Sequence, residues 1–222
     1  MPNSVPESRR GIVPVLAAVF AAAAAVAGPV YTDNFDSGAQ LPWENQRGNW
    51  VAGGGAYYAG SPNNSPVTAS LLPYVAGDFV AEVDIGNLND GGLWARADST
   101  ATVGVMLILR SHDIYWHVIT NPISGPWDIY GYQSRSGTSA HVKLTAAGDI
   151  LSAYLNGAAT PITTLDLSTI SRPGYDYSSG RFGLYSNSSQ TFDNVSLTIP
   201  EPATLGLLVL GGWAALIRRR HR

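Results

Sequence analysis

The sequence predicts an all-β fold, a sandwich or barrel of short strands, for residues 28–199. This stretch is rich in Gly, Ser, Thr, Tyr and Trp, and it holds no run of ten or more residues with helical apolar spacing. Short alternating or apolar runs are instead separated by residues that favour turns. A series of such strands is typical of sandwiches and barrels.

The strand pattern recurs along the whole stretch. In chain order the expected strands are residues 30–35, 49–52, 56–59, 78–85, 92–97, 103–110, 114–120, 128–133, 141–146, 151–155, 181–185 and 190–198. Residues 103–109 are apolar on both faces, which predicts a central strand that is covered on two sides. Gly148-Asp149 and Asn156-Gly157 have the chemistry of hairpin turns, and Gly53-Gly54-Gly55 also predicts a turn.

Net charge limits the partners of the folded body. The whole chain has a net charge of −3, but six of its thirteen basic residues lie outside residues 28–199. Within that stretch seven Lys and Arg face fourteen Asp and Glu, which leaves −7. Nucleic-acid binding requires clustered positive charge, so we exclude nucleic acid as a partner. The absence of cysteine excludes thiol catalysis and zinc sites with Cys ligands.

Residues 1–27 are expected to be a signal peptide. Arg9 and Arg10 precede an Ala-rich apolar run at residues 12–25, and residues 25–27 form a small-x-small cleavage pattern. The run is shorter than the about 20 apolar residues that a membrane-spanning helix needs, so we expect a signal helix that is removed. The arginine pair also resembles a twin-arginine signal, which leaves the export route open between the Sec and twin-arginine systems.

Residues 200–222 carry three features in a fixed order. Pro200, Glu201 and Pro202 are followed by an apolar run at residues 203–217 and then by an arginine-rich end at residues 218–222. This arrangement resembles the PEP-CTERM sorting signal. The resemblance implies recognition by an exosortase-type membrane protease, with the Pro-Glu-Pro residues as the recognised motif. An ordinary C-terminal membrane tail is the alternative.

The apolar run predicts a short transmembrane helix. Fifteen helical residues span about 22 Å, less than the bilayer core of about 30 Å, which suits a transient anchor in the inner membrane. The arginine cluster is expected to stay in the cytoplasm, which leaves residues 28–199 outside the inner membrane. We therefore expect an exported protein of the cell envelope, cell surface or extracellular matrix.

Three motifs in the body point to one fold family. They are Asp33-Asn34-Phe35-Asp36, the hairpin from residues 142–144 to residues 154–157, and the ending at residues 180–185 and 192–195. These resemble the concanavalin A-like jelly roll, and more narrowly laminin-G-like domains and the sugar-hydrolase-related domains of that superfamily. The resemblance implies two packed antiparallel sheets with a concave face, which binds carbohydrate in many relatives.

Glu82 and Asp84 form a pair of acids on one strand. In residues 79–85 they lie on the face opposite the apolar stripe of Phe79, Ala81, Val83 and Ile85, so their carboxylates project side by side. The pair resembles the start of the Glu-x-Asp-x-x-Glu pattern of laminarinase-type glucanases, but Asn87 stands where the third acid belongs. We expect ligand contact or a solvated strand face here, and we assign no catalytic residue.

Other residues are candidates for a binding surface. Aromatic rings offer sugars an apolar platform, and Arg and His supply directed hydrogen bonds, although core packing explains such rings equally well. The candidates are Trp94, Arg96, Arg110, His117, Tyr130 and Tyr132. A calcium site is a further candidate, because the first and last strands of this fold run close together and calcium favours oxygen ligands. Its expected ligands are Asp33, Asp36 and Asp193.

Three functions remain open on the sequence. The leading hypothesis is a non-enzymatic surface or matrix protein that binds polysaccharide. The alternatives are a glycoside hydrolase that acts on exported polysaccharide and a purely structural matrix protein. Fold alone does not choose among them.

Overall fold

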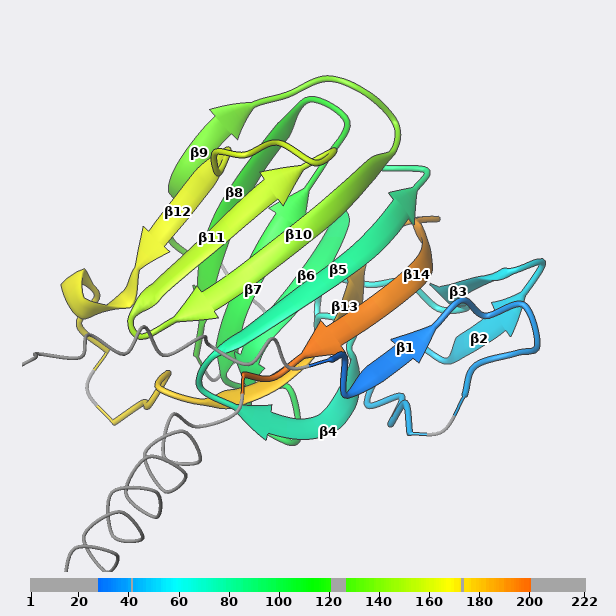
Figure 1. Ribbon diagram of the computed structural model, residues 1–222, viewed down its shortest axis with the longest axis horizontal. Helices are drawn as coiled ribbons and strands as arrows, with labels where there is room; N and C mark the ends of the chain where they lie inside the picture. The colour runs from blue at the N-terminus through cyan, green and yellow to red at the C-terminus, as the bar shows by residue number, and fades with distance from the viewer. Residues whose placement is uncertain (1–27, 41, 121–126, 173, 201–222) are drawn as a thin grey trace, which may run out of the picture. The chain divides into compact units, whose positions relative to one another are not determined.

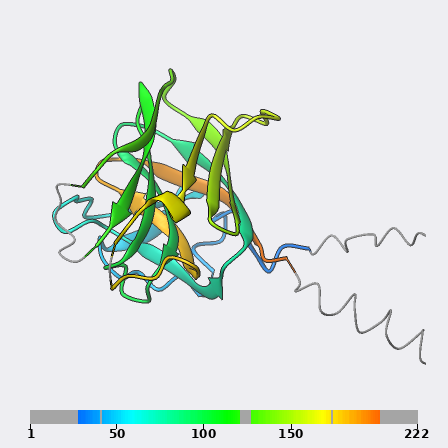
Figure 2. The same cartoon turned by 90° about the vertical axis from the view of Figure 1, so that its left-hand side faces the viewer.

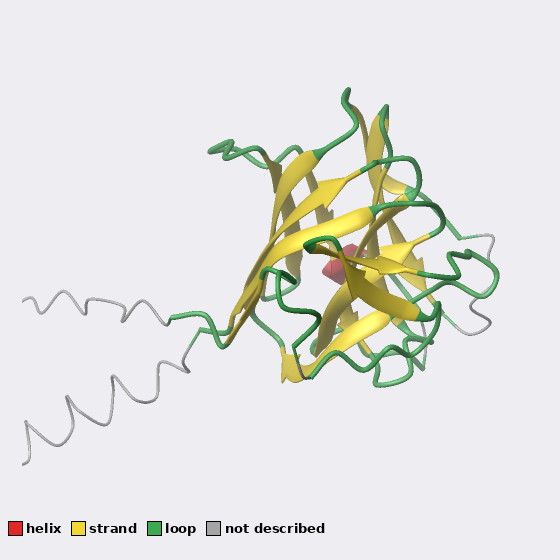
Figure 3. Cartoon of the chain, turned by 90° about the vertical axis from the view of Figure 1, so that its right-hand side faces the viewer, coloured by secondary structure: helices red, strands yellow, loops and turns green. Residues whose placement is uncertain are grey.

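Two antiparallel sheets make up the part of the protein described by the computed structural model, which covers residues 28–40, 42–120, 127–172 and 174–200. They pack face to face as a jelly-roll-like sandwich, with one layer in front of the other in Figure 1 and both layers seen from the side in Figure 2. The expected signal and C-terminal helices lie outside the described residues. Figure 3 shows the short 3-10 turn η1 (Leu167–Thr169), and within the described ranges no helical segment has the length and apolar character needed to cross a membrane.

The first sheet has eight strands. Its order is β12 (Thr163–Asp166), β11 (Ile150–Leu155), β10 (Ala140–Ala147), β5 (Phe79–Gly86), β14 (Thr191–Thr198), β3 (Ala56–Ala59) and β2 (Trp50–Gly53), and β1 (Tyr31–Asp33) pairs with β14. Figure 1 shows β11, β10, β5 and β14 side by side at the front. Asp33 lies opposite Val195, so the first and last strands are neighbours, as the resemblance implied.

The second sheet has six strands. Its order is β4 (Ser70–Ala76), β13 (Gly180–Ser186), β6 (Gly91–Ala97), β7 (Gly104–Leu109), β8 (Asp113–Ile119) and β9 (Tyr130–Ser134). Every residue of β7 is buried and the strand lies between β6 and β8, which confirms the predicted central strand. All the expected strands are present, with bounds that agree to within two residues.

The main core lies between the sheets because each strand sends alternate side chains inward. On β5 the apolar stripe of Phe79, Ala81, Val83 and Ile85 is buried, whereas Glu82 and Asp84 face outward, as predicted. On β8 Ile114, Trp116 and Val118 join the same core, which leaves Tyr115 and His117 on the outer face. A second, smaller apolar cluster covers part of that outer face and includes Trp94 and Met106.

The predicted turns are present. Asn156 and Gly157 both have positive φ, at 54° and 75°, and the Ala158 amide donates to the Leu155 carbonyl, so these residues form a tight turn at the start of the connection from β11 to β12. Gly148 also has a positive φ in the connection between β10 and β11. Gly148 and Asp149 are thus the two residues that join β10 to β11.

The sequence did not predict β4 and β12. β4 contains Pro73, which a strand tolerates only at a sheet edge, and β4 is an edge strand. β12 has only four residues, and it is held by a contact between the sheets: the Trp116 indole Nε1 donates to Thr163 Oγ1 at 3.1 Å. Thr163 in turn donates to the Gly131 carbonyl. This side of the sandwich is therefore closed by β12 lying against β8 and β9.

Candidate functional site

The structure places two of the expected ligand-binding residues in the interior. Trp94 is fully buried, and its indole Nε1 donates to the Thr68 carbonyl at 3.1 Å. Arg96 is also buried, and its guanidinium donates to the carbonyls of Gly77 and Tyr177 at 3.0 Å each. Neither side chain reaches the surface, which corrects the expectation that they lie on a binding surface. Both hold loops against the sheet.

Tyr130 and Tyr132 do not share a face, although they stand two positions apart on β9. The β8 to β9 register shifts between Ile114 and Trp116, and Gly131 has a φ of 57°, which marks a bulge. Tyr130 therefore packs against the inter-sheet core, while Tyr132 is 52% exposed on the outer face. The expectation that both rings line one surface is wrong because alternation fails at the bulge.

Five side chains on the outer face of β8, β9 and the adjoining loops contact one another around the buried Tyr115 ring, and we call this cluster the aromatic patch. Its members are Arg110, Tyr115, His117, Trp127 and Tyr132. The Tyr115 ring centroid is 5.1 Å from that of His117 and 6.3 Å from that of Tyr132, whose ring is stacked on it. The His117 ring is 5.5 Å from Trp127. The patch therefore joins exposed ring surface to two polar side chains.

Arg110 is held in place by a buried carboxylate. Its Nε and Nη2 donate to the two oxygens of Asp113 at 2.7 and 2.8 Å, and its Cζ lies 5.1 Å above the Tyr115 ring centroid. These hydrogen bonds raise the pKa of Arg110, so the guanidinium stays charged. No described residue accepts a hydrogen bond from Nη1, which leaves that nitrogen free to donate to a ligand oxygen.

His117 presents a hydrogen-bond acceptor. Its Nδ1 lies 2.9 Å from the Asp128 carbonyl, which can only accept, so Nδ1 carries the proton of the neutral ring. Burial lowers the pKa of His117 below its usual value of 6.5, which keeps the ring neutral near pH 7. Nε2 then has a lone pair, and no described residue donates a hydrogen bond to it. The patch thus offers an acceptor beside the donor of Arg110.

A buried tyrosine and an aspartate lie next to the patch. Tyr185 donates its hydroxyl to Asp90 at 3.4 Å, and Asn187 Nδ2 donates to the other oxygen of Asp90 at 3.0 Å. Burial, and then the charge of Asp90, raise the pKa of Tyr185, so its hydroxyl remains a donor. This arrangement fixes Asp90 at the edge of the outer face.

Glu82 and Asp84 lie on the other sheet, away from the aromatic patch. On the outer face of the eight-stranded sheet, Asp84 accepts from His141 Nδ1 at 2.7 Å and from Asn194 Nδ2 at 2.8 Å. Glu82 lies 4.0 Å from His141 Nε2. The acid pair is therefore tied to a histidine and an amide, and it does not converge with Trp94 or Arg96.

The three expected calcium ligands are placed in separate hydrogen-bond groups. Asp33 is buried and accepts from the Phe35 and Gln40 amides and from the Tyr31 hydroxyl. Asp36 accepts from the Asn34 side chain, and Asp193 from the Asn194 amide. Within the described ranges no group of three or more His, Asp or Glu side chains is placed to hold a metal. The aspartates as placed do not form the expected site.

Sequence reasoning missed Tyr115, Trp127, Asp113 and Asp90. A usable signal was present for two of them. Tyr115 alternates with His117 on one strand, so the two share a face, and Asp113 follows Arg110 by three residues across a tight turn in which the Arg110 amide donates to the Asp113 carbonyl. Trp127 and Asp90 reach the patch from loops, and strand periodicity does not place loop residues.

A comparison with known sequence families decides the nature of the C-terminal segment. Residues 198–220 match the PEP-CTERM protein-sorting motif. The chain carries a PEP-CTERM sorting motif. This motif indicates an exported protein that is sorted to the cell envelope. Glu201 and Pro202 of the motif lie outside the described residues, and a search of the curated proteins finds no match to the sequence.

Solved structures resemble the sandwich. The carbohydrate-binding module CBM66 from Bacillus subtilis superposes with a TM-score of 0.57 and 19% identity, covering 70% of this chain and 94% of the module. The GH43 protein BlXynB from Bacillus licheniformis gives 0.54 and 12% over 75% of this chain, but only 39% of that protein. A non-specific endo-β-1,3(4)-glucanase of family GH16 gives 0.51 and 9% over 80% of this chain and 92% of that enzyme. At these identities the likeness is one of fold, shared by binding modules and glycoside hydrolases.

Proposed function

We propose that the protein is exported, is processed at its PEP-CTERM motif by an exosortase-type protease, and binds polysaccharide at the cell surface or in the extracellular matrix through the aromatic patch. The observation that carries the binding proposal is the patch itself. It combines an exposed Tyr132 ring with an Arg110 donor and a His117 acceptor, both fixed by protein groups.

The chemistry of the patch matches that of a sugar ring. One face of a sugar is lined by C–H groups that pack on aromatic rings, while its hydroxyls both donate and accept hydrogen bonds. Asp113 and the Asp128 carbonyl hold the Arg110 and His117 side chains before any ligand arrives, so binding costs little ordering entropy. The likeness to a carbohydrate-binding module supports the same proposal.

Retention on polysaccharides tests the proposal. The purified full chain is incubated with cellulose, xylan, chitin, mannan and β-1,3-glucan, and the bound fraction is measured. At least one polysaccharide should retain the chain. Tyr132→Ala should lower its affinity about five- to thirtyfold, equivalent to about 1–2 kcal/mol. The matched control is Tyr154→Ala, because Tyr154 lies on the other sheet, where its ring contacts Lys143.

Two outcomes would contradict the proposal. One is that none of the polysaccharides retains the chain. The other is that Tyr132→Ala and Tyr154→Ala bind the polysaccharide with the same affinity. In either case the patch would not be a saccharide site.

The glycoside hydrolase alternative has a different test. Hydrolases also share this fold, and the Asp84 and His141 pair lines a cavity of about 360 Å³ on the outer face of the eight-stranded sheet. However, both oxygens of Asp84 already accept hydrogen bonds, and Asn87 replaces the third acid of the glucanase pattern. Release of reducing sugar that Glu82→Gln abolishes would establish hydrolysis, whereas retention without release supports a binding protein.

A further inference from the structure

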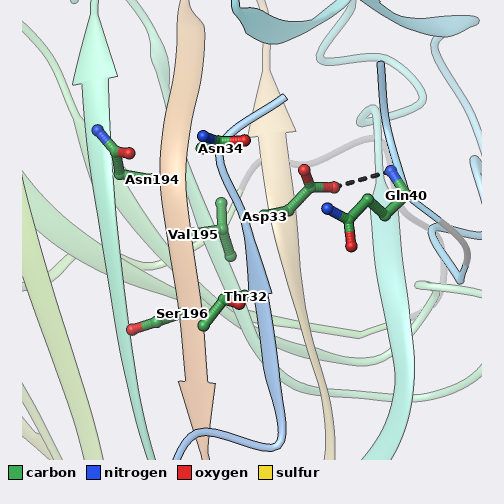
Figure 4. A pocket seen from close by; sticks show the side chains of 7 residues that line it. All are labelled: Thr32, Asp33, Asn34, Gln40, Asn194, Val195 and Ser196. Carbon is green, nitrogen blue, oxygen red and sulfur yellow. Dashed lines mark hydrogen bonds between the residues drawn. The ribbon is translucent and has the colours of Figure 1, made fainter. Parts of the chain in front are cut away.

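A second cavity opens on the outer face of the eight-stranded sheet, on the side of the sandwich opposite the aromatic patch. Its volume is about 440 Å³, within the range of small-molecule sites. β1, the loop that follows it and β14 supply the lining, which Figure 4 shows: Thr32, Asp33, Asn34, Gln40, Asn194, Val195 and Ser196. We call this the β1–β14 cavity.

The single carboxylate of the cavity is already satisfied. Asp33 Oδ1 accepts from the Phe35 amide at 2.9 Å, and Oδ2 accepts from the Gln40 amide at 2.9 Å and the Tyr31 hydroxyl at 2.8 Å. Burial, and then the hydrogen bond to Asp33, raise the pKa of Tyr31, so this hydroxyl keeps its proton and remains a donor. Asp33 is therefore a structural acceptor, and both of its carboxylate oxygens are already occupied by donors of the protein.

The other polar groups of the cavity are neutral and available. Thr32 Oγ1, Ser196 Oγ, the Gln40 side-chain amide and Asn194 Oδ1 have no partner among the described residues. Figure 4 shows Thr32 and Ser196 beside one another on β1 and β14, with Gln40 on the other side of Asp33. Hydroxyls and amides both donate and accept hydrogen bonds. A cation would find no free charge here, and an anion would find no positive charge, whereas sugar hydroxyls match both kinds of group.

A polar surface leads out of the cavity across β14. Asn194 lines the β1–β14 cavity, and its Nδ2 donates to Asp84 Oδ2 at 2.8 Å. Asp84 in turn lines the neighbouring cavity together with His141 and Asn156. Further units of a chain-like ligand can therefore lie along this face and meet hydrogen-bonding groups.

We propose that the β1–β14 cavity is a second saccharide site that takes a neutral sugar unit. The two sites lie on the two outer faces of the sandwich, so one polypeptide can hold two polysaccharide strands at once. The bridging role rests on the function proposed for the aromatic patch. Occupancy of the cavity by a sugar does not depend on that function.

The amide side chains of the cavity report on occupancy directly. The purified full chain, labelled with nitrogen-15, is titrated with methyl β-glucoside, methyl β-xyloside and methyl α-mannoside up to their solubility. At least one glycoside should shift the Gln40 and Asn194 side-chain amide signals saturably. The Asn45 and Asn63 signals, which lie outside the cavity, should stay unchanged.

A matched pair of variants separates a site from a general solvent effect. Thr32→Val removes one hydroxyl at nearly constant volume and should weaken binding about five- to tenfold. Thr198→Val makes the same change on the same face but outside the cavity, and it should leave the affinity unchanged. The proposal is overturned if no glycoside shifts the two signals saturably, or if Thr32→Val binds as the unsubstituted chain does.

Light scattering of the full chain mixed with the polysaccharide that retains it tests the bridging. Both Thr32→Val and Tyr132→Ala should lower cross-linking, because each weakens one of the two sites. Retention should weaken mainly in Tyr132→Ala. If Tyr132→Ala changes nothing while the cavity signals still shift, the proposed function fails and the second site stands. If cross-linking is unchanged in Thr32→Val, the cavity does not bridge the strands.

Discussion

Replacing Asp113 with alanine tests the argument that a buried carboxylate holds the aromatic patch together. The Asp113 side chain is 2% exposed and accepts two hydrogen bonds from Arg110, at 2.7 and 2.8 Å. Hydrogen bonds between charged groups contribute about 1.5–3 kcal/mol each. The Arg110 side chain is 31% exposed, so water can hydrate part of the guanidinium once its partner is gone. We therefore expect Asp113→Ala to lower the free energy of unfolding by about 3 kcal/mol.

Denaturant titration and calorimetry measure this loss. For a chain of this size, about 3 kcal/mol corresponds to a melting temperature lower by about 6–12 °C. The control is Asp128→Ala, which removes a pair of the same kind: Asp128 lies 2.7 Å from Arg172, but its side chain is 70% exposed. An exposed pair contributes about 0–1 kcal/mol. If the two substitutions cost the same, burial of the Asp113 carboxylate does not stabilise the patch.

Three further predictions concern the patch, the sheet and the tail. Burial lowers the pKa of His117, so the unfolded chain takes up its proton at a higher pH than the folded chain does. Neutral His117 therefore contributes fully to the free energy of unfolding above about pH 6.5, and this contribution is lost as the pH falls through the folded pKa. Denaturant titrations at about pH 7.5 and about pH 5 should show this loss in the unsubstituted chain but not in His117→Gln. Gly92→Ala should cost about 3 kcal/mol or more, because a Cβ would lie 1.8 Å from the Leu107 carbonyl oxygen, whereas Gly148→Ala, which meets open space, should cost about 1–2 kcal/mol; equal unfolding free energies would contradict this. Glu201→Ala should leave uncleaved chain in the membrane fraction on immunoblots, and normal processing would show that the Pro-Glu-Pro segment is not recognised.

The strands could be predicted because their signals are local. The two-residue period of Phe79, Ala81, Val83 and Ile85 fixes which face of β5 is buried, and it places Glu82 and Asp84 outside. The central position of β7 follows in the same way from apolar residues on both faces. The sorting motif is also a linear pattern, so its residues were identified without a fold.

The candidate site could be predicted only in part, because it depends on which side chains other segments cover and on the register between β8 and β9. Trp94 and Tyr132 are both large aromatic residues on strands of one sheet, but Trp94 is covered by the segment that contains Val67 and Ala69, whereas Tyr132 is open to solvent. The bulge at Gly131 separates Tyr130 from Tyr132. The alternation of residues in the sequence predicts neither the covering of Trp94 nor the bulge at Gly131.

The sequence by itself determined most of the strands, the inward face of several of them and the sorting motif, since each depends on neighbours within a few residues along the chain. Only the tertiary structure decided which side chains meet. Asp84 reaches His141 and Asn194 because β5 lies between β10 and β14, and Asp33 is enclosed because β1 pairs with β14. Those pairings are set by burial of the whole core, a property that no single segment carries.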